Sequence, residues 1–361
     1  MSDTGEQPPK LATGPVTTEA LKTISVPTER RRIAVLGAGS WGTTFAKVLA
    51  EGGSDVSIWA RRPEIAREIT ETHRNSDYLP GINLPLALVS DSRIERVLDG
   101  AEQVYLSVPS QTLRENLKAV RQLIPAGVPV ISLMKGVERG TGRRMSEIVR
   151  EELDIDPELI AVASGPNLAL EIARRQPTAA VVASDSLDTA ALVAATATNP
   201  YFRCFVNNDV IGTEFGGVLK NLIAVAIGIV DGVGYGENTK ASIITRGLVE
   251  MTQFAVAFGA KAETLSGLAG LGDLIATCES PLSRNNTAGR LLGQGYAFAD
   301  VVKQMNQTAE GLASVAPILE LARSKGVDMP IVEQVEQVLA GTLAPRNLAP
   351  HLTDTDEPQG E

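Results

Sequence analysis

Lys220 stands directly before an apolar run at residues 222–230, a setting in which a charged side chain needs a physical reason. Partial burial lowers the pKa of a lysine ammonium toward the range that is useful for proton donation. The neighbouring Asn221 adds an amide that could orient a hydroxyl or a carboxamide. A lysine that snorkels to the surface, or that lies at an interface, would give the same pattern. Proton transfer by Lys220 is therefore one of two open interpretations.

Other candidate residues follow expected strands or lie in glycine-rich loops. Lys135 follows an expected strand, at the carboxyl end where parallel sheets bind ligands, and Gly165 and Asn167 follow the next one. Asp273 is a carboxylate in an apolar loop, with no cation close to it in the sequence. Each of these residues could instead belong to a cap, a turn or the surface.

The segment Ser283, Arg284 and Asn285 combines a guanidinium with short polar side chains. A guanidinium binds phosphate oxygens through strong, charge-assisted hydrogen bonds. The segment is therefore a candidate phosphate site, with a helix cap or a surface loop as the alternative.

A glycine-rich turn follows the first expected strand, residues 33–36. Gly37 permits the tight turn, Gly39 lets the backbone approach a pyrophosphate, and Gly42 lets the next helix pack close to the strand. Free N–H groups at the helix start would then meet the anionic pyrophosphate. A second strand follows at the spacing of a dinucleotide-binding unit, which favours a cofactor site over a purely structural turn.

Arg61 and Arg62 come at the end of that second strand, where NAD-specific sites usually place an acidic residue. A guanidinium at this position can meet the 2′-phosphate of NADPH. We therefore expect NADPH or NADH as the cofactor, with NADPH favoured. Two solvated surface arginines are the alternative.

The elements that must position these residues change type once along the chain. Short β-branched runs alternate with helical stretches up to residue 207, which predicts an α/β fold with a Rossmann-type doubly wound parallel sheet. The apolar runs expected to be strands are 33–36, 56–59, 103–107, 130–133, 160–163 and 179–183. Beyond residue 208, apolar residues at helical spacing predict an all-helical C-terminal domain, with helices at 213–230, 241–259, 313–324 and 331–339.

Four segments follow from this pattern. We expect a disordered N-terminal extension at 1–30 and a mobile tail at 346–361, because both are too polar to pack. Between them we expect a dinucleotide-binding domain at 31–207 and a helical substrate and catalytic domain at 208–345.

The composition of the 361 residues excludes several classes of function. Two Cys and two His are too few for a disulfide scaffold, a structural zinc site or histidine-based metal binding, so we expect no metal. A net charge of −10 argues against nucleic-acid binding. The apolar run at 222–230 is far shorter than the roughly 20 residues of a membrane span. We therefore expect a cytoplasmic protein without membrane insertion.

Across these segments the chain resembles the NAD(P)-dependent glycerol-3-phosphate dehydrogenases of the bacterial type, over about residues 31–345. The segments that carry the resemblance are 37–43, 78–80, 84–85, 108–110, 135–136, 164–166, 219–221, 270–273, 283–285 and 309–311. The resemblance implies reversible reduction of dihydroxyacetone phosphate to sn-glycerol 3-phosphate, which supplies glycerophospholipid synthesis. It also implies a homodimer.

The resemblance further implies a role for each candidate residue. Lys220 resembles the proton donor to the C2 alkoxide, Lys135 a lysine that touches both substrate and cofactor, and Asp273 the acidic partner of the catalytic lysine. The other implied substrate contacts are Gly165, Asn167, Ser283, Arg284 and Asn285. The other implied cofactor contacts are Ser40, Trp41, Ala169, Arg284 and Glu310.

Two other functions stay open on the sequence alone. One is a related reductase of a 3-hydroxyacid or of ketopantoate, and the other is a non-catalytic NADPH-binding module. Asp273 and the segment 283–285 favour the phosphorylated triose over the first. Lys135, Lys220, Asp273 and Arg284 together form a complete set of groups for catalysis, which argues against the non-catalytic module.

Overall fold

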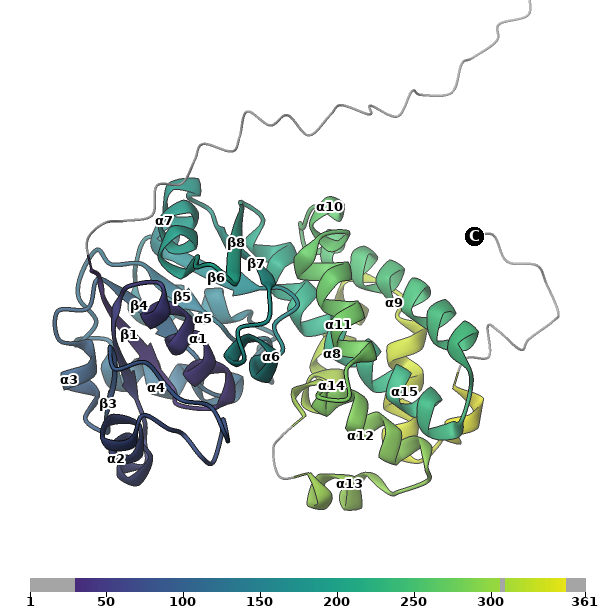
Figure 1. Cartoon of the computed structure of the whole chain (residues 1–361). Coiled ribbons are helices and arrows are strands. Elements are labelled where there is room, and N and C mark those ends of the chain that lie inside the picture. The colour runs from purple at the N-terminus through teal and green to yellow at the C-terminus, as the bar shows by residue number, and fades with distance from the viewer. Residues whose placement is uncertain (1–29, 306–308, 349–361) are drawn as a thin grey trace, which may run out of the picture.

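One sheet of eight strands organises the first half of the computed structural model, which describes residues 30–305 and 309–348 (Figure 1). The strands lie in the order β3-β2-β1-β4-β5-β6-β7-β8. Their bounds are β1 (Arg32–Leu36), β2 (Asp55–Trp59), β3 (Leu88–Asp91), β4 (Gln103–Leu106), β5 (Val130–Ser132), β6 (Ile160–Ser164), β7 (Thr178–Ser184) and β8 (Phe202–Asn207). The first six strands have the order of a doubly wound dinucleotide-binding fold, so the predicted fold class is confirmed.

The sheet differs from the prediction at its far edge. β7 runs antiparallel to β6, and β8 runs parallel to β7, so the sheet is mostly rather than wholly parallel. A buried strand has a continuous apolar run whichever way it points, so the sequence pattern carried no information on direction. β8 was not predicted because, at the edge, buried and exposed residues alternate along its first half. β3 was missed because it has only four residues, two of them Ser and Asp.

Helices cover both faces of the sheet. Alternate residues of a strand point to opposite faces, so Val35 of β1 and Tyr105 of β4 share a core with α1, α2 and α7. Leu36 and Val104 pack on the other face, against α3, α4 and α5. The helix bounds are α1 (Ser40–Glu51), α2 (Pro63–Thr72), α3 (Ile94–Leu98), α4 (Leu113–Val120), α5 (Met145–Leu153), α6 (Ala169–Ala173) and α7 (Leu187–Ala197).

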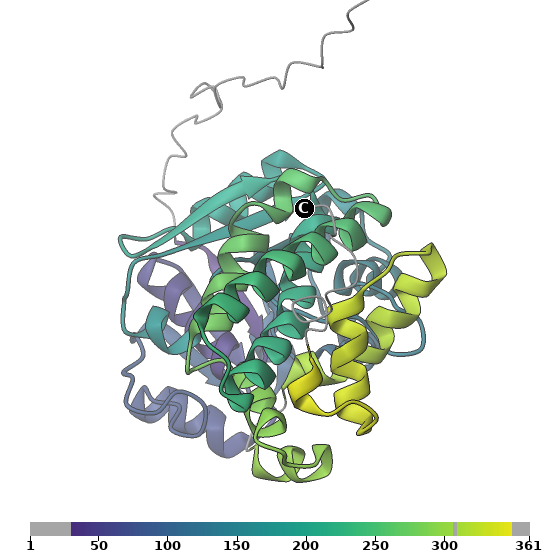
Figure 2. The same cartoon turned by 90° about the vertical axis from the view of Figure 1, so that its right-hand side faces the viewer.

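The second part of the described chain is helical and is built around α8 (Val210–Val233), as Figures 1 and 2 show. By length and hydropathy α8 could cross a membrane, but 83% of its most apolar window is buried inside the protein. Its apolar character on all sides therefore fits a central core helix. The surrounding elements are α9 (Glu237–Ala257), α10 (Ala262–Leu265), the π-helical turn η4 (Leu268–Gly272), α11 (Asp273–Glu279), α12 (Arg284–Gly293), α13 (Phe298–Gln304), α14 (Glu310–Lys325) and α15 (Pro330–Ala340).

The sheet ends at Asn207 and α8 begins at Val210, next to the expected boundary between the two parts. The expected N-terminal extension, apart from Arg30, lies outside the described residues, and so does the expected tail from residue 349 onward. Leu348 is buried in the core of the helical part, so the packed chain extends past the expected end at residue 345.

Candidate active site

One carboxylate between two ammonium groups forms the centre of the candidate site. The Nζ atom of Lys220 donates to Oδ1 of Asp273 at 2.7 Å, and the Nζ atom of Lys135 donates to Oδ2 of Asp273 at 2.6 Å. Asp273 is 1% exposed and Lys220 is 7% exposed. Lys135 comes from the segment after β5, Lys220 from α8, and Asp273 from the start of α11. The structure thus brings together three residues that were each indicated separately by their own sequence context.

Burial sets the protonation behaviour of Lys220. It lowers the pKa of the ammonium from 10.5 to about 8, because the charged form loses hydration. This value is the net result: the negative charge of Asp273 opposes the effect of burial on the pKa, and the positive charge of Lys135 adds to it. The Nζ atom also donates to Oγ1 of Thr277 at 2.6 Å. Lys220 is therefore a fixed ammonium that can release a proton near neutral pH.

Glycines explain how Asp273 comes so close to α8. A Cβ atom on Gly216 of α8 would lie 2.3 Å from the carbonyl oxygen of Ala269, and one on Gly270 would lie 2.0 Å from that of Leu265. Only glycine at these two positions lets the turn η4 fold tightly and pack on α8. The glycine-rich sequence before Asp273 is therefore the local cause of the Asp273–Lys220 contact.

Unpartnered polar atoms lie near the lysine cluster. Lys135 Nζ also donates to the carbonyl oxygen of Gly165 at 3.1 Å. The hydroxyl of Ser164 and both polar atoms of the Asn167 side chain are buried, and they form no hydrogen bond with any residue that the structure describes. Buried polar groups normally have partners, so these atoms could receive hydrogen bonds from, or donate them to, a bound molecule.

The start of α12 uses two predicted substrate contacts for internal structure. Ser283 caps the helix, its Oγ atom accepting from the N–H of Asn286 at 3.2 Å. Asn285 donates from Nδ2 to Oδ1 of Asn221 at 2.9 Å, and its own Oδ1 accepts from the N–H of Gly311 at 3.0 Å. These contacts hold α12 and α14 against α8, next to Lys220.

Arg284 and Glu310 differ from these capping residues. Arg284 is exposed at the first position of α12, and Glu310 is half-buried at the first position of α14. Burial raises the pKa of Glu310, and the positive charges of Arg284, Lys135 and Lys220 oppose this increase. Both predicted residues therefore lie within the electrostatic reach of the cluster.

The glycine-rich turn has the geometry that its sequence predicts. Gly37 has φ +120°, and a Cβ atom there would lie 2.3 Å from the carbonyl oxygen of Ser107. A Cβ atom on Gly42 would lie 2.0 Å from the carbonyl oxygen of Gly37, whereas nothing lies within 4 Å of the Cβ position of Gly39. Gly39 is the N-cap of α1 and no side chain caps the helix, so its first N–H groups can bind an anion. These features fit the pyrophosphate of a dinucleotide.

Three further predicted cofactor contacts lie around the start of α1. Ser40 is its first residue and is half-buried. Trp41 donates its indole N–H to the carbonyl oxygen of Leu133, at the end of β5, at 3.1 Å. The carbonyl oxygen of Ala169 accepts from the hydroxyl of Thr44 on α1 at 3.3 Å. These contacts join α1, β5 and α6, the elements beside the turn.

The structure separates the two arginines after β2. Arg62 donates from Nη2 to Oδ2 of Asp77 at 2.6 Å, and its guanidinium lies 5.5 Å from the ring centre of Tyr78. Arg61 is exposed and forms no hydrogen bond or ion pair within residues 30–305 and 309–348. The guanidinium of Arg61 is therefore available to a phosphate, and that of Arg62 is engaged.

Two residues of the site were missed in the sequence. Thr277 follows Asp273 by four residues on α11, so helical spacing was the available signal. Asn75 is fully buried and donates from Nδ2 to the carbonyl oxygen of Ala38 at 2.9 Å and to Oγ1 of Thr43 at 2.8 Å. It supports the glycine-rich turn from a distant segment, for which the sequence carries no local signal.

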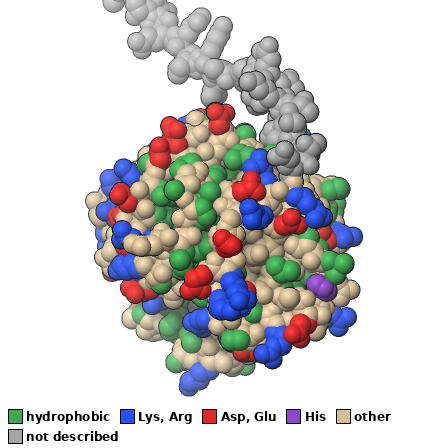
Figure 3. All heavy atoms as spheres, turned by 90° about the vertical axis from the view of Figure 1, so that its left-hand side faces the viewer, with side chains coloured by type: hydrophobic (Ala, Val, Ile, Leu, Met, Phe, Trp, Pro, Cys, Tyr) green, Lys and Arg blue, Asp and Glu red, His purple; other side chains and the backbone are tan. Residues whose placement is uncertain are grey.

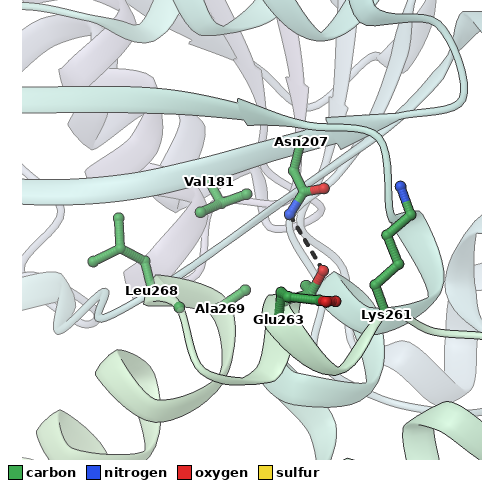
Figure 4. Close-up of a pocket in the computed structure, with 8 residues that line it drawn as sticks. Val181, Asn207, Lys261, Glu263, Leu268 and Ala269 are labelled. Atoms are coloured by element: carbon green, nitrogen blue, oxygen red, sulfur yellow. Dashed lines mark hydrogen bonds between the residues drawn. The ribbon is translucent and has the colours of Figure 1, made fainter. Parts of the chain in front are cut away.

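A cavity of about 260 Å³ lies beside η4, between β7, β8 and α10 (Figure 4). Its lining includes Val181, Asn207, Lys261 and Leu268. Across it Asn207 donates to Oγ1 of Thr264 at 3.5 Å. None of the predicted site residues lines this cavity, so it is separate from the lysine cluster.

Comparison with known proteins identifies the family. The model described as the N-terminus of NAD-dependent glycerol-3-phosphate dehydrogenase matches residues 32–190, and the model of its C-terminus matches residues 209–350. The chain belongs to the NAD-dependent glycerol-3-phosphate dehydrogenase family.

Individual members of this family match along almost the whole chain. A glycerol-3-phosphate dehydrogenase (NAD(P)+) of Leifsonia xyli subsp. xyli is 75% identical over 327 residues, covering 91% of this chain and 89% of the relative. One of Thermobifida fusca is 51% identical, with coverage of 87% and 94%. A crystal structure of glycerol-3-phosphate dehydrogenase from Coxiella burnetii has a TM-score of 0.85 and 36% identity, and covers 90% of this chain and 99% of that one.

Proposed function

We propose that this chain catalyses the reversible NAD(P)H-dependent reduction of dihydroxyacetone phosphate to sn-glycerol 3-phosphate, a precursor for glycerophospholipid synthesis. The observation that carries the proposal is the buried Lys135–Asp273–Lys220 cluster, where the two parts of the chain meet. Relatives at 75% and 51% identity bear the name of this activity.

Lys220 acts as the proton donor in this proposal. A bound nicotinamide would supply a hydride to C2 of the ketone, and the ketone oxygen would then carry negative charge. An ammonium with a pKa of about 8 can donate a proton to that oxygen at neutral pH, and the resulting amine can take the proton back in reverse. Lys135 adds a second fixed positive charge, and Asp273 holds both ammonium groups in place.

Arg284 binds the substrate phosphate, from its exposed position at the start of α12. The phosphate is remote from the reacting carbon, so its binding energy can hold the ketone in position for hydride transfer. Asn167, whose side chain has no partner in the described structure, contacts the bound substrate near Gly165. Ser283 and Asn285 support the start of α12 rather than supply its charge.

The cofactor is NADPH or NADH, with NADPH favoured. The open position at Gly39 and the uncapped start of α1 receive the pyrophosphate. The exposed guanidinium of Arg61 meets the 2′-phosphate, while Arg62 holds the adjoining loop through Asp77. Ser40, Trp41, Ala169 and Glu310 would be the further cofactor contacts.

A second copy of this chain is the expected partner, in a homodimer. The exposed stripe of α9 is largely uncharged and includes Val249 and Val256, each 45% exposed. We propose that the enzyme is cytoplasmic. It needs no membrane insertion of α8, because most of that helix is buried in the core of the protein. Nucleic acid is not a partner in this proposal. On the face shown in Figure 3, acidic and basic side chains are interspersed rather than gathered into a basic surface.

The test is the absorbance of NADPH after dihydroxyacetone phosphate is added to the purified chain. We expect rapid oxidation, and much slower oxidation with unphosphorylated dihydroxyacetone, ketopantoate or a 3-oxoacid. Oxidation with ketopantoate or a 3-oxoacid alone would assign a related reductase activity. NADPH binding without oxidation of any of these ketones would assign a non-catalytic module.

A further inference from the structure

Glu214 is a buried carboxylate on α8 that the lysine cluster does not use. It is 6% exposed, and burial raises its pKa while the charge of Arg144 and hydrogen bonds from Ser146 oppose that increase. Its Oε2 accepts from Nη1 of Arg144 at 2.6 Å and from the hydroxyl of Ser146 at 2.6 Å. Its Oε1 accepts from the backbone N–H of Ser146 at 2.9 Å. Both carboxylate oxygens are therefore bonded.

These bonds cross from the helical part to the sheet part. Arg144 is the N-cap of α5, and Ser146 lies in its first turn. The guanidinium of Arg144 also lies 6.0 Å from the ring centre of Phe215, the residue after Glu214. One turn of α8 thus binds the beginning of α5 by an ion pair, hydrogen bonds and an aromatic contact.

Arg144, the ion-pair partner of Glu214, lies at the end of a short folded segment that begins with Lys135. The segment from Lys135 to Arg144 folds back on itself, with an antiparallel bridge between Val137 and Arg144. The N–H of Glu138 donates to the carbonyl oxygen of Arg143 at 2.9 Å. Val137 is fully buried and belongs to the core of the helical part, although it follows β5 in the sheet part. Lys135, at the start of this folded segment (residues 135–144), lies within hydrogen-bond distance of Asp273.

We propose that Glu214 is a positioning residue for proton transfer. By binding Arg144 and Ser146, it holds the segment 135–144 against α8, so that Lys135 and Lys220 reach the same carboxylate. The proposal rests on the proton-donor role proposed for Lys220. A buried ion pair is weak evidence for stability, since desolvation offsets its attraction, whereas its fixed geometry can determine which groups meet.

The test compares Glu214→Gln with Glu152→Gln. Glu152 accepts from Nη1 of Arg114 at 2.5 Å within the sheet part. Arg114 also donates to Glu138 of the folded segment, and Glu152→Gln leaves those bonds and the link to α8 in place, so it removes a neighbouring ion pair without loosening the segment from α8. We expect Glu214→Gln to lower kcat about tenfold to a hundredfold, because a shift of about 1 Å in a positioned group has an effect of that size. The Kd for NADPH should stay within about twofold of wild type, and Glu152→Gln should leave kcat within the same margin.

The pH dependence separates positioning from stability. A loosened segment admits water to Lys220 and moves Lys135 away, and both changes raise the pKa of Lys220, whose other neighbours are Asp273, Thr277, Cys278 and Glu310. The basic limb of kcat should therefore move to higher pH in Glu214→Gln and stay fixed in Glu152→Gln. A lower Tm with unchanged kcat and an unchanged limb would overturn the proposal.

Two further measurements keep the test decisive. If Glu214→Gln does not fold, Ser146→Ala removes one hydrogen bond to Oε2 and keeps the ion pair, so we expect a smaller loss of kcat and a smaller shift of the basic limb in the same direction. NMR of labelled lysine side chains gives the Lys220 pKa without turnover. If wild type does not reduce dihydroxyacetone phosphate, the proposed function fails, and an unchanged Lys220 pKa in the variant then separately refutes the role of Glu214.

Discussion

The glycine-rich turn and the lysine cluster, the two halves of the proposed active site, have opposite construction. Gly37, Gly39 and Gly42 lie within one short segment, where a Cβ atom would clash with backbone at Gly37 and Gly42 and would fill an open position at Gly39. Lys135, Lys220 and Asp273 come from three separate elements, and only tertiary packing brings them together. We therefore expect cofactor binding to depend on the geometry of the glycine-rich turn, and proton transfer to depend on the assembled fold. Substitutions in the two regions should therefore affect different kinetic constants.

Lys220→Ala should show the largest effect. Loss of the proton donor should lower kcat by about 10²–10⁴-fold, while the Kd for NADPH stays near wild type, because the turn is untouched. Stopped-flow turnover and cofactor titration measure the two constants. Lys118→Ala is the matched control, since that lysine is exposed on α4, and it should change neither constant. Near-wild-type turnover in Lys220→Ala would remove the cluster from the chemistry.

Asp273→Asn should have the next largest effect. The variant leaves two ammonium groups close together without the carboxylate between them, so we expect kcat to fall about tenfold to a hundredfold. The charge of Asp273 raises the pKa of Lys220, so its removal should move the basic limb of kcat to lower pH. A pH profile of turnover checks this direction. A limb that moves to higher pH would contradict the assigned electrostatics.

Gly42→Ala should affect the other half of the comparison. A Cβ atom 2.0 Å from the carbonyl oxygen of Gly37 forces the turn and α1 apart. We expect the Kd for NADPH to rise about tenfold, equivalent to about 1.4 kcal/mol, while kcat at saturating cofactor falls much less. Gly236→Ala is the control, because nothing lies within 4 Å of that Cβ position. Equal losses of kcat in Gly42→Ala and Lys220→Ala would erase the distinction between the two regions.

Arg61→Ala should have the smallest effect and sharpen the cofactor assignment. A charge-assisted contact at an exposed position is worth about 1 kcal/mol, so the KM for NADPH should rise about fivefold. The KM for NADH should not change, because NADH lacks the 2′-phosphate, and it serves as the internal control. An equal rise for both cofactors would place Arg61 away from the 2′-phosphate.

The same contrast explains what could be predicted from the sequence. Gly37, Gly39 and Gly42 could be assigned roles directly, because all three belong to one short motif whose spacing after a strand carries those roles. Lys220 and Asp273 could be singled out by their apolar surroundings, but their pairing was implied only by the family resemblance, since residue spacing does not encode their distance. At Ser283 the sequence could not separate a helix cap from a substrate contact, because both use the same polar groups.

The fold shows a similar limit. The run at β7 predicted a buried strand correctly, but burial gave no information on its antiparallel direction. The role of Asn75 depends on a contact with Ala38 across the fold, which no local pattern records.

In the proposed mechanism, the buried side chain of Lys220 donates the proton as an ammonium in reduction and accepts it as a neutral amine in oxidation. The most direct measurement is kcat in both directions as a function of pH. Reduction should slow as pH rises through about 8, because it needs the protonated form of Lys220. Oxidation should slow as pH falls through the same value, because it needs the neutral form. Beyond the midpoint, each rate should change about tenfold per pH unit. Rates that do not depend on pH in this range, or that change in the same direction, would contradict the proposed mechanism.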